Sequence, residues 1–173
     1  GNTDVQNLVV TVTDDGETVP VISSDPTDAV SVVENTTAVT TVTVVDADAA
    51  EDITFAKTTT GAAADYADNG AFTLTKTGAK TASLVFTVAP NHETPTDTGL
   101  DNVYNIEITV TDLDGNTDVQ TLTVTVDDEN DNTPVVTSAN TATIDENTTA
   151  ILTITATDAD STAGNNKIGR AHV

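Results

Sequence analysis

Apolar residues alternate with threonine along most of this chain, which is the period of a half-buried β-strand. The alternation predicts seven short strands separated by Gly- and Asp-rich turns, the first strand being split in two. Their predicted bounds are residues 19–23 with 30–33, 38–45, 53–59, 71–75, 82–88, 104–112 and 119–126. No stretch shows a helical period, so the pattern predicts an all-β sandwich.

The same alternation selects one face of each predicted strand for the core. The outward face is mostly Thr, whose branched side chain suits a pleated surface. The predicted core residues are Val42, Val44, Ile53, Phe55, Phe72, Leu74, Leu84, Phe86, Val88, Tyr104, Ile106, Ile108, Val110, Leu122, Val124 and Val126.

The sequence repeats itself. Residues 1–6 (Gly-Asn-Thr-Asp-Val-Gln) return 114 residues later as residues 115–120. Residues 34–38 (Glu-Asn-Thr-Thr-Ala) return 112 residues later as residues 146–150, and an Asp-Ala-Asp triplet returns at the same offset. Self-similarity at a fixed period indicates a tandem array, and a unit of this length is the size of a small β-sandwich.

The repeat divides the chain. We expect residues 1–15 to be the last strand of a preceding repeat, residues 16–127 a complete repeat, residues 128–134 a linker and residues 135–167 the truncated start of the next repeat. Residues 168–173 break the acidic, Thr-rich composition and resemble the in-frame translation of a common sequencing adapter. We therefore exclude them from the expected fold.

The linker reads Asp-Glu-Asn-Asp-Asn-Thr-Pro, with five consecutive side chains that end in oxygen. It is either a polar hairpin loop or a site for a hard cation. A hairpin of this kind favours Gly at a position of positive φ, and the stretch contains none. Ca²⁺, in contrast, takes about six to eight oxygen ligands in a flexible cage. The motif resembles the linker of cadherin repeats, which implies a Greek-key β-sandwich of the cadherin and immunoglobulin type with calcium bound where two repeats meet.

Further elements resemble cadherin motifs that supply calcium ligands. They are Val33-Glu34-Asn35, Asn91-His92-Glu93 and the two Asp-x-Asp pairs. For the joint after the complete repeat, the resemblance implies the ligands Glu34, Asn91, Glu93, Glu129, Asn130, Asp131, Asn132, Asp158 and Asp160. For the joint before it, the resemblance implies Asp14, Glu17, Asp46, Asp48 and Asp112. Gly16 and Thr18 replace two amide ligands there, so we expect the earlier joint to bind calcium more weakly.

Acidic residues are also common at turns without any metal. When acidic residues are packed into one joint, however, they repel one another. Two like charges about 4 Å apart repel by about 4 kcal/mol at an effective dielectric near 20. We therefore expect cations to decide whether the joint is ordered.

Composition excludes several classes of partner and of chemistry. The chain has 28 acidic and 5 basic residues, a net charge of −23, which disfavours nucleic acid and anionic lipid. It has no Cys, and no apolar span predicts membrane insertion. No nucleophile elbow, phosphate-binding loop or His-Glu-x-x-His motif is present, so we expect no enzymatic activity. His92 is expected to face solvent beside Glu93.

These observations predict a calcium-stiffened spacer or adhesion module of a large bacterial surface or secreted protein. Its expected partners are calcium ions, neighbouring repeats of the same chain and other cell-surface proteins. A ligand-binding module is a second interpretation, although Tyr66 is the one aromatic residue expected to be exposed for sugar stacking. An accessory domain of an extracellular enzyme is a third, and the sequence leaves it open.

Overall fold

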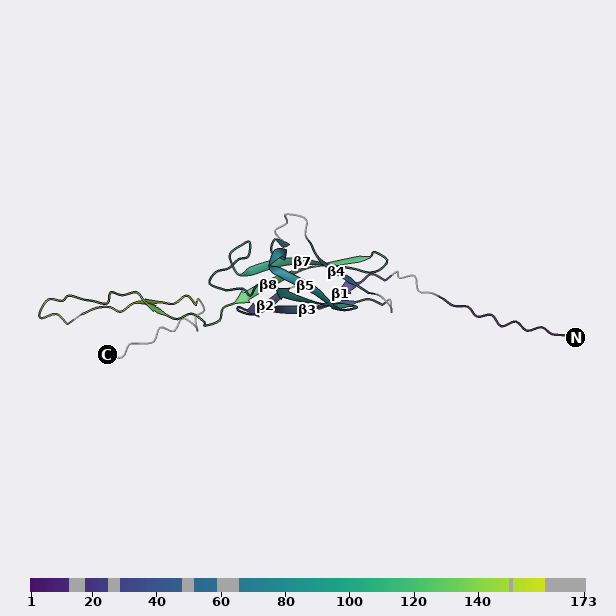
Figure 1. The fold of residues 1–173 in the computed structure, drawn as a ribbon, viewed down its shortest axis with the longest axis horizontal. Helices are drawn as coiled ribbons and strands as arrows, with labels where there is room; N and C mark the ends of the chain where they lie inside the picture. The colour runs from purple at the N-terminus through teal and green to yellow at the C-terminus, as the bar shows by residue number, and fades with distance from the viewer. Residues whose placement is uncertain (13–17, 25–28, 48–51, 59–65, 150, 161–173) are drawn as a thin grey trace.

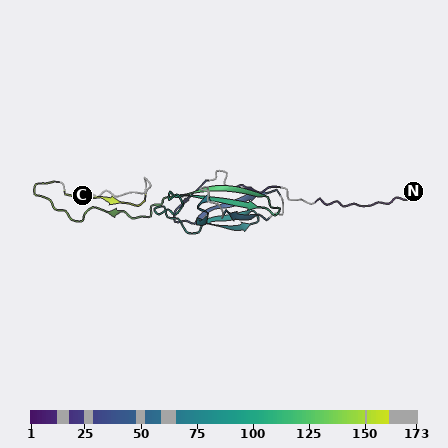
Figure 2. The same cartoon turned by 90° about the horizontal axis from the view of Figure 1, so that it is seen from above.

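The computed structural model describes residues 1–12, 18–24, 29–47, 52–58, 66–149 and 151–160. At its centre two four-stranded sheets pack face to face (Figures 1 and 2). One sheet has the order β1 (Val21–Ile22), β3 (Ala38–Val45), β6 (Thr81–Phe86), β5 (Phe72–Gly78). The other has the order β2 (Ala29–Val33), β8 (Thr117–Asp127), β7 (Val103–Thr111), β4 (Thr54–Lys57). A short 3-10 turn, η2 (Asn69–Ala71), precedes β5.

The split first strand is confirmed. β1 pairs antiparallel with β3 in one sheet, and β2 pairs parallel with β8 in the other. If β1 and β2 are counted as one strand, the sandwich has the predicted strands in the predicted order. The all-β prediction holds, and the bounds shift by a few residues, because β5 extends to Gly78 and β6 ends at Phe86.

The core lies between the sheets. Phe72 and Phe86 lie 4.5 Å apart between ring centroids, and Tyr104 meets both rings edge-on. The buried apolar residues are Val32, Val42, Val44, Ile53, Phe72, Ala82, Leu84, Phe86, Tyr104, Ile106, Ile108, Val110, Leu122, Val124 and Val126.

Most of the predicted core is confirmed, with one error and two omissions. Val88 is exposed, because β6 ends two residues earlier and the chain leaves the sheet. Phe55 and Leu74 are only partly buried, since β4 and β5 are edge strands with a neighbour on one side. The alternation missed Val32 and Ala82, which are buried.

The two ends of the described chain extend from opposite ends of the sandwich (Figures 1 and 2). Toward the C-terminus, β9 (Val135–Val136) pairs antiparallel with β10 (Ala156–Thr157). Residues 1–12 form no strand, although their alternation predicts one. Their apolar side chains are exposed, whereas β8, which carries nearly the same sequence, lies between β2 and β7. The part of the chain that the structure describes has no helix of the length and apolar character needed to span a bilayer.

Candidate metal centre

The candidate metal centre lies at the end of the sandwich from which the linker leaves. β2 and β8 are parallel neighbours with Val33 opposite Asp127, so Glu34 and the linker emerge together at one edge of the sheet. The Glu34 N–H donates to the Asp127 carbonyl at 3.0 Å. This parallel pairing brings a residue early in the repeat to the residues that follow its last strand.

Glu34 is fully buried in this joint. Its Oε2 accepts a hydrogen bond from the His92 N–H at 2.8 Å, and its Oε1 accepts one from the Glu129 N–H at 2.9 Å. Next to it, Asn35 adopts a left-handed conformation (φ 61°), and its N–H donates to the Pro90 carbonyl at 2.9 Å. The Glu34 carboxylate thus joins the loop after β6 to the linker.

Glu93 is the least compensated carboxylate in the joint. One oxygen each of Glu34, Glu93 and Asp131 lie within 4.8 Å of one another. Both side-chain oxygens of Glu93 are buried, and neither has a hydrogen-bond partner. Burial raises the pKa of Glu93, and the neighbouring Glu34 and Asp131 carboxylates raise it further. Its own backbone N–H and the Asn132 amide lower the pKa, but neither reaches hydrogen-bonding geometry.

The residues present fit a hard cation. A buried carboxylate without donors is costly unless a positive charge compensates it. The surrounding groups are carboxylate and amide oxygens, the ligands that Ca²⁺ prefers.

The linker joins the sandwich to the following segment. Asp131 Oδ2 accepts a hydrogen bond from Asn35 Nδ2 at 2.7 Å, and Asp131 Oδ1 accepts one from Asn132 Nδ2 at 2.8 Å. Asn132 Nδ2 also donates to Asp160 Oδ1 at 2.9 Å, and the Asn132 N–H faces both Asp160 oxygens at 3.3 Å. Asp160 is fully buried, and its N–H donates to Asp158 Oδ1 at 3.4 Å. The Asp-x-Asp pair after β10 is therefore held against the linker.

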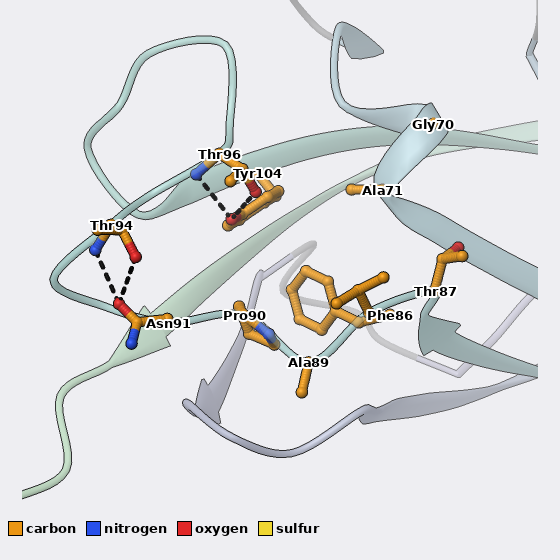
Figure 3. A pocket seen from close by; sticks show the side chains of 11 residues that line it. Gly70, Ala71, Phe86, Thr87, Ala89, Pro90, Asn91, Thr94, Thr96 and Tyr104 are labelled. Carbon is orange, nitrogen blue, oxygen red and sulfur yellow. Dashed lines mark hydrogen bonds between the residues drawn. The ribbon is translucent and has the colours of Figure 1, made fainter. Parts of the chain in front are cut away.

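Not every predicted ligand of this joint points into it. Asn91 Oδ1 accepts hydrogen bonds from the Thr94 N–H at 2.8 Å and from the Thr94 hydroxyl at 2.6 Å, so it closes a local turn (Figure 3). Glu129 and Asn130 are exposed, but so is Asp131 of the cluster, so their exposure does not exclude them. The predicted ligands that the structure brings together are Glu34, Glu93, Asp131, Asn132, Asp158 and Asp160.

Two residues of this joint were missed as candidate ligands. His92 Nδ1 lies 4.0 Å from Glu93 Oε1 and 3.9 Å from Asp128 Oδ1. The expectation that His92 faces solvent beside Glu93 holds in part, because its side chain lies beside Glu93 but is only 22% exposed. Its backbone is hydrogen-bonded on both sides, to Glu34 Oε2 and to Asn102 Nδ2. Their positions in the sequence could have identified them as candidate ligands, since His92 directly precedes Glu93 and Asp128 is the first residue of the linker motif.

The joint at the other end of the sandwich is described only in part, because Asp14, Glu17 and Asp48 lie outside the described residues. Asp112 is buried there, and its two oxygens accept hydrogen bonds from the Asn116 N–H at 2.7 Å and from Asn116 Nδ2 at 2.8 Å. The Asp46 carbonyl accepts a hydrogen bond from Lys80 Nζ at 2.8 Å. Weaker calcium binding at this joint stays a prediction.

An apolar pocket of about 450 Å³ lies beside the end of β6, and Pro90 and Asn91 of the following loop line part of it (Figure 3). Phe86 and Tyr104 line it, but both are buried, so neither presents an open ring face for stacking a sugar. The Tyr104 hydroxyl is already hydrogen-bonded to the Thr96 hydroxyl at 3.1 Å. Tyr66, which was expected to be exposed, is partly buried. These features give the ligand-binding interpretation no support.

Comparison with known proteins places the fold. No family model matches the chain, and no curated protein matches it in sequence. Among solved structures it resembles the protocadherin GammaB4 extracellular domain, at 22% identity and a TM-score of 0.58, over 88% of this chain and 23% of that one. It also resembles human CDH23 EC21-23, at 19% identity and a TM-score of 0.57, over 87% of this chain and 47% of that one. Human protocadherin-24 EC1-2 matches at 19% identity and a TM-score of 0.53, over 83% of this chain and 61% of that one.

The chain therefore spans between 23% and 61% of the length of these three structures. At such identities the likeness establishes the architecture rather than an activity. The chain has the cadherin-like β-sandwich fold.

Proposed function

We propose that this chain is a calcium-binding repeat segment, in which Ca²⁺ at the joint stiffens the connection between the sandwich and the segment that follows. The observation that carries the proposal is Glu93, whose two buried oxygens have no hydrogen-bond partner and which lies against the Glu34 and Asp131 carboxylates. A divalent cation between the three carboxylates would compensate two of their three negative charges.

The donor set favours Ca²⁺ over Mg²⁺. Carboxylate oxygens converge from the end of β2, the loop after β6 and the linker. Ca²⁺ tolerates such an irregular cage, whereas Mg²⁺ demands near-octahedral geometry and dehydrates reluctantly. Glu129 and Asn130 adjoin Asp131 in the linker and Asp158 is hydrogen-bonded to Asp160, so these three could complete the shell. Asn91 is the poorest of the proposed ligands because its oxygen is used by Thr94.

The mechanical consequence follows from where the ligands are attached. Glu34 and Glu93 belong to the sandwich, Asp131 belongs to the linker, and the linker contacts Asp160 through Asn132. A bound cation would therefore connect the two segments, and without it the carboxylates would repel. Such a segment would serve as a spacer or adhesion module of an extracellular bacterial protein, with calcium, neighbouring repeats and other cell-surface proteins as partners. An accessory module of an extracellular enzyme could use the same joint, but no described residue favours that role.

Calcium titration of the full chain tests this proposal. Calorimetry should detect binding, and a Ca²⁺ concentration about 100 times the Kd should stabilise the folded state by about 2.7 kcal/mol. The absence of both heat and a change in Tm would refute the proposal.

Two matched variants locate the site. Glu93→Gln should abolish most of the calcium-dependent stabilisation while leaving the chelated protein no less stable than the wild type, because it removes an uncompensated buried charge. Glu146→Gln alters an exposed glutamate and should leave calcium binding unchanged. Equal calcium responses of the wild type and Glu93→Gln would show that Glu93 is not a ligand.

A further inference from the structure

The segment after the linker repeats the opening strands of the sandwich in the same register. In the sandwich, Val21 of β1 lies opposite Val45 of β3. In the later segment, Val135 of β9 lies opposite Thr157 of β10. The repeat relates the two pairs, since 135 − 21 is 114 and 157 − 45 is 112, which are the two offsets of the sequence repeat. β9 and β10 therefore correspond to β1 and β3.

The residues of that segment that correspond to β2 do not form a strand. At the offset of 112, they are residues 141–145. In the sandwich, β2 is an edge strand whose neighbour in the sheet is β8. Ile144 and Ile154 are 47% and 59% exposed, whereas the equivalent Val32 and Val42 are buried. The segment thus has an uncovered apolar side where a strand like β8 would pair.

Residues 5–12 have the sequence of β8 and do not form a strand either. Their Leu8, Val10 and Val12 are exposed, whereas the residues at the equivalent positions of β8 are buried. Residues 5–12 and 141–145 are therefore the two partners of one β8–β2 pair. They extend from opposite ends of the sandwich, so they cannot meet within one copy of the chain (Figures 1 and 2).

We propose that residues 5–12 of one copy pair in parallel with residues 141–145 of a second copy, so that copies of this chain associate head to tail. The register of β2 and β8 places Val12 opposite Ile144. The contact joins two different surfaces and does not close on itself, so it generates open chains of copies. It does not rest on calcium binding, because neither segment contains a residue of the calcium cluster.

Charge and strand length set the strength of this association. Each copy carries a net charge of −23, so copies repel one another, and added salt should strengthen the contact by screening that repulsion. Short strands that pair outside a complete sheet are marginally stable in water. The contact should therefore form in concentrated protein and dissociate on dilution, which leaves residues 5–12 free in dilute solution.

Disulfide trapping tests the register, because the chain has no cysteine of its own. Val12→Cys is mixed with Ile144→Cys in a thiol–disulfide buffer, since neighbouring strands bring Cα atoms within the range of about 4.4–6.8 Å that a disulfide needs. The control is Val5→Cys, which is similarly exposed but lies about 23 Å further along an extended strand. The mixed disulfide should form at least about tenfold more with Val12→Cys than with Val5→Cys. Equal yields would overturn the proposal.

Sedimentation of the full chain tests the association without a cross-link. The average mass of the wild type should rise with protein concentration, in calcium and in chelator alike. Val10→Asp should abolish the rise, whereas Val88→Asp, which adds the same charge at an equally exposed valine of the sandwich, should retain it. A wild-type mass that does not change with concentration, or a rise that survives in Val10→Asp, would contradict the proposal. Loss of calcium binding in Glu93→Gln should leave the rise unchanged, which separates this contact from the proposed calcium site.

Discussion

Residues 5–12 and 119–126 carry nearly the same sequence and have different structures. Residues 119–126 lie within β8, between β2 and β7, and Leu122 is 3% exposed. Residues 5–12 form no strand, and Leu8, which occupies the equivalent position, is 79% exposed. Alternation therefore indicates that a segment can form a strand, and the presence of neighbouring strands decides whether it does.

A second repeated pair separates local from tertiary effects. Asn35 and Asn147 have φ values of 61° and 65°. Each is followed by a Thr whose hydroxyl donates to a carbonyl three residues earlier, Thr36 at 2.6 Å and Thr148 at 2.8 Å. The turn is thus the same in both copies, yet Glu34 is fully buried and Glu146 is exposed. Local sequence fixes the turn, and packing fixes the environment of the carboxylate.

Hydrogen exchange should show the largest difference between the repeated segments. The amides of residues 119–126 should exchange about a thousandfold or more slowly than those of residues 5–12, because β8 opens only with the sandwich. Exchange followed by NMR on the full chain measures both segments at once. Strong protection of residues 5–12 would break the comparison, since it would mean that this copy has taken the place of β8.

Leu122 and Leu8, which occupy equivalent positions in the repeated segments, provide the next test. Leu122→Ala should lower the free energy of unfolding by about 2–5 kcal/mol, because it opens a cavity between the sheets. Leu8→Ala should change it by less than about 0.5 kcal/mol. Denaturant unfolding monitored by circular dichroism measures both variants, and similar losses would show that residues 5–12 pack in solution.

Glu34 and Glu146, which occupy equivalent positions in the repeated segments, should give a smaller effect. In chelator, Glu34→Ala removes the acceptor of the partly buried His92 and Glu129 N–H groups, at a combined cost of about 1–3 kcal/mol. Relief of the repulsion with Glu93 offsets part of that cost. Glu146→Ala serves as the control and should be neutral in the same denaturant titration. A neutral Glu34→Ala would mean that the joint is open without cations.

Asn116 and Asn2, which occupy equivalent positions in the repeated segments, should give the smallest effect. Burial acts to raise the pKa of Asp112, but hydrogen bonds from the Asn116 side chain and backbone outweigh it, so the pKa is lowered. The stabilisation from Asp112 is therefore present above the ordinary Asp pKa and is lost as the pH falls through the lowered one. Asn116→Ala should raise the Asp112 pKa and reduce the loss of free energy of unfolding at acid pH. Asn2→Ala should do neither. Carboxyl ¹³C titration by NMR measures the pKa, and an unchanged Asp112 value in Asn116→Ala would show that the side chain is dispensable.

The sequence by itself determined the strand order, the split first strand and most of the core, because each depends on the two-residue period of side chains along a strand. It also determined the turns at Asn35 and Asn147, since a left-handed Asn and a Thr hydrogen bond are local devices. The resemblance to cadherin motifs selected Glu34, Glu93 and Asp131, which the structure brings together.

Only the tertiary structure decided which polar groups face one another. It brought the His92 ring close to Asp128 of the linker, whereas the contact of Asn91 with Thr94 in the same loop is a local turn. The reason is that a side chain's partners depend on contacts far away in sequence, such as Glu34 with the Glu129 N–H. Periodicity records which face of a strand is apolar, but it holds no information about which loops meet at the end of the sandwich.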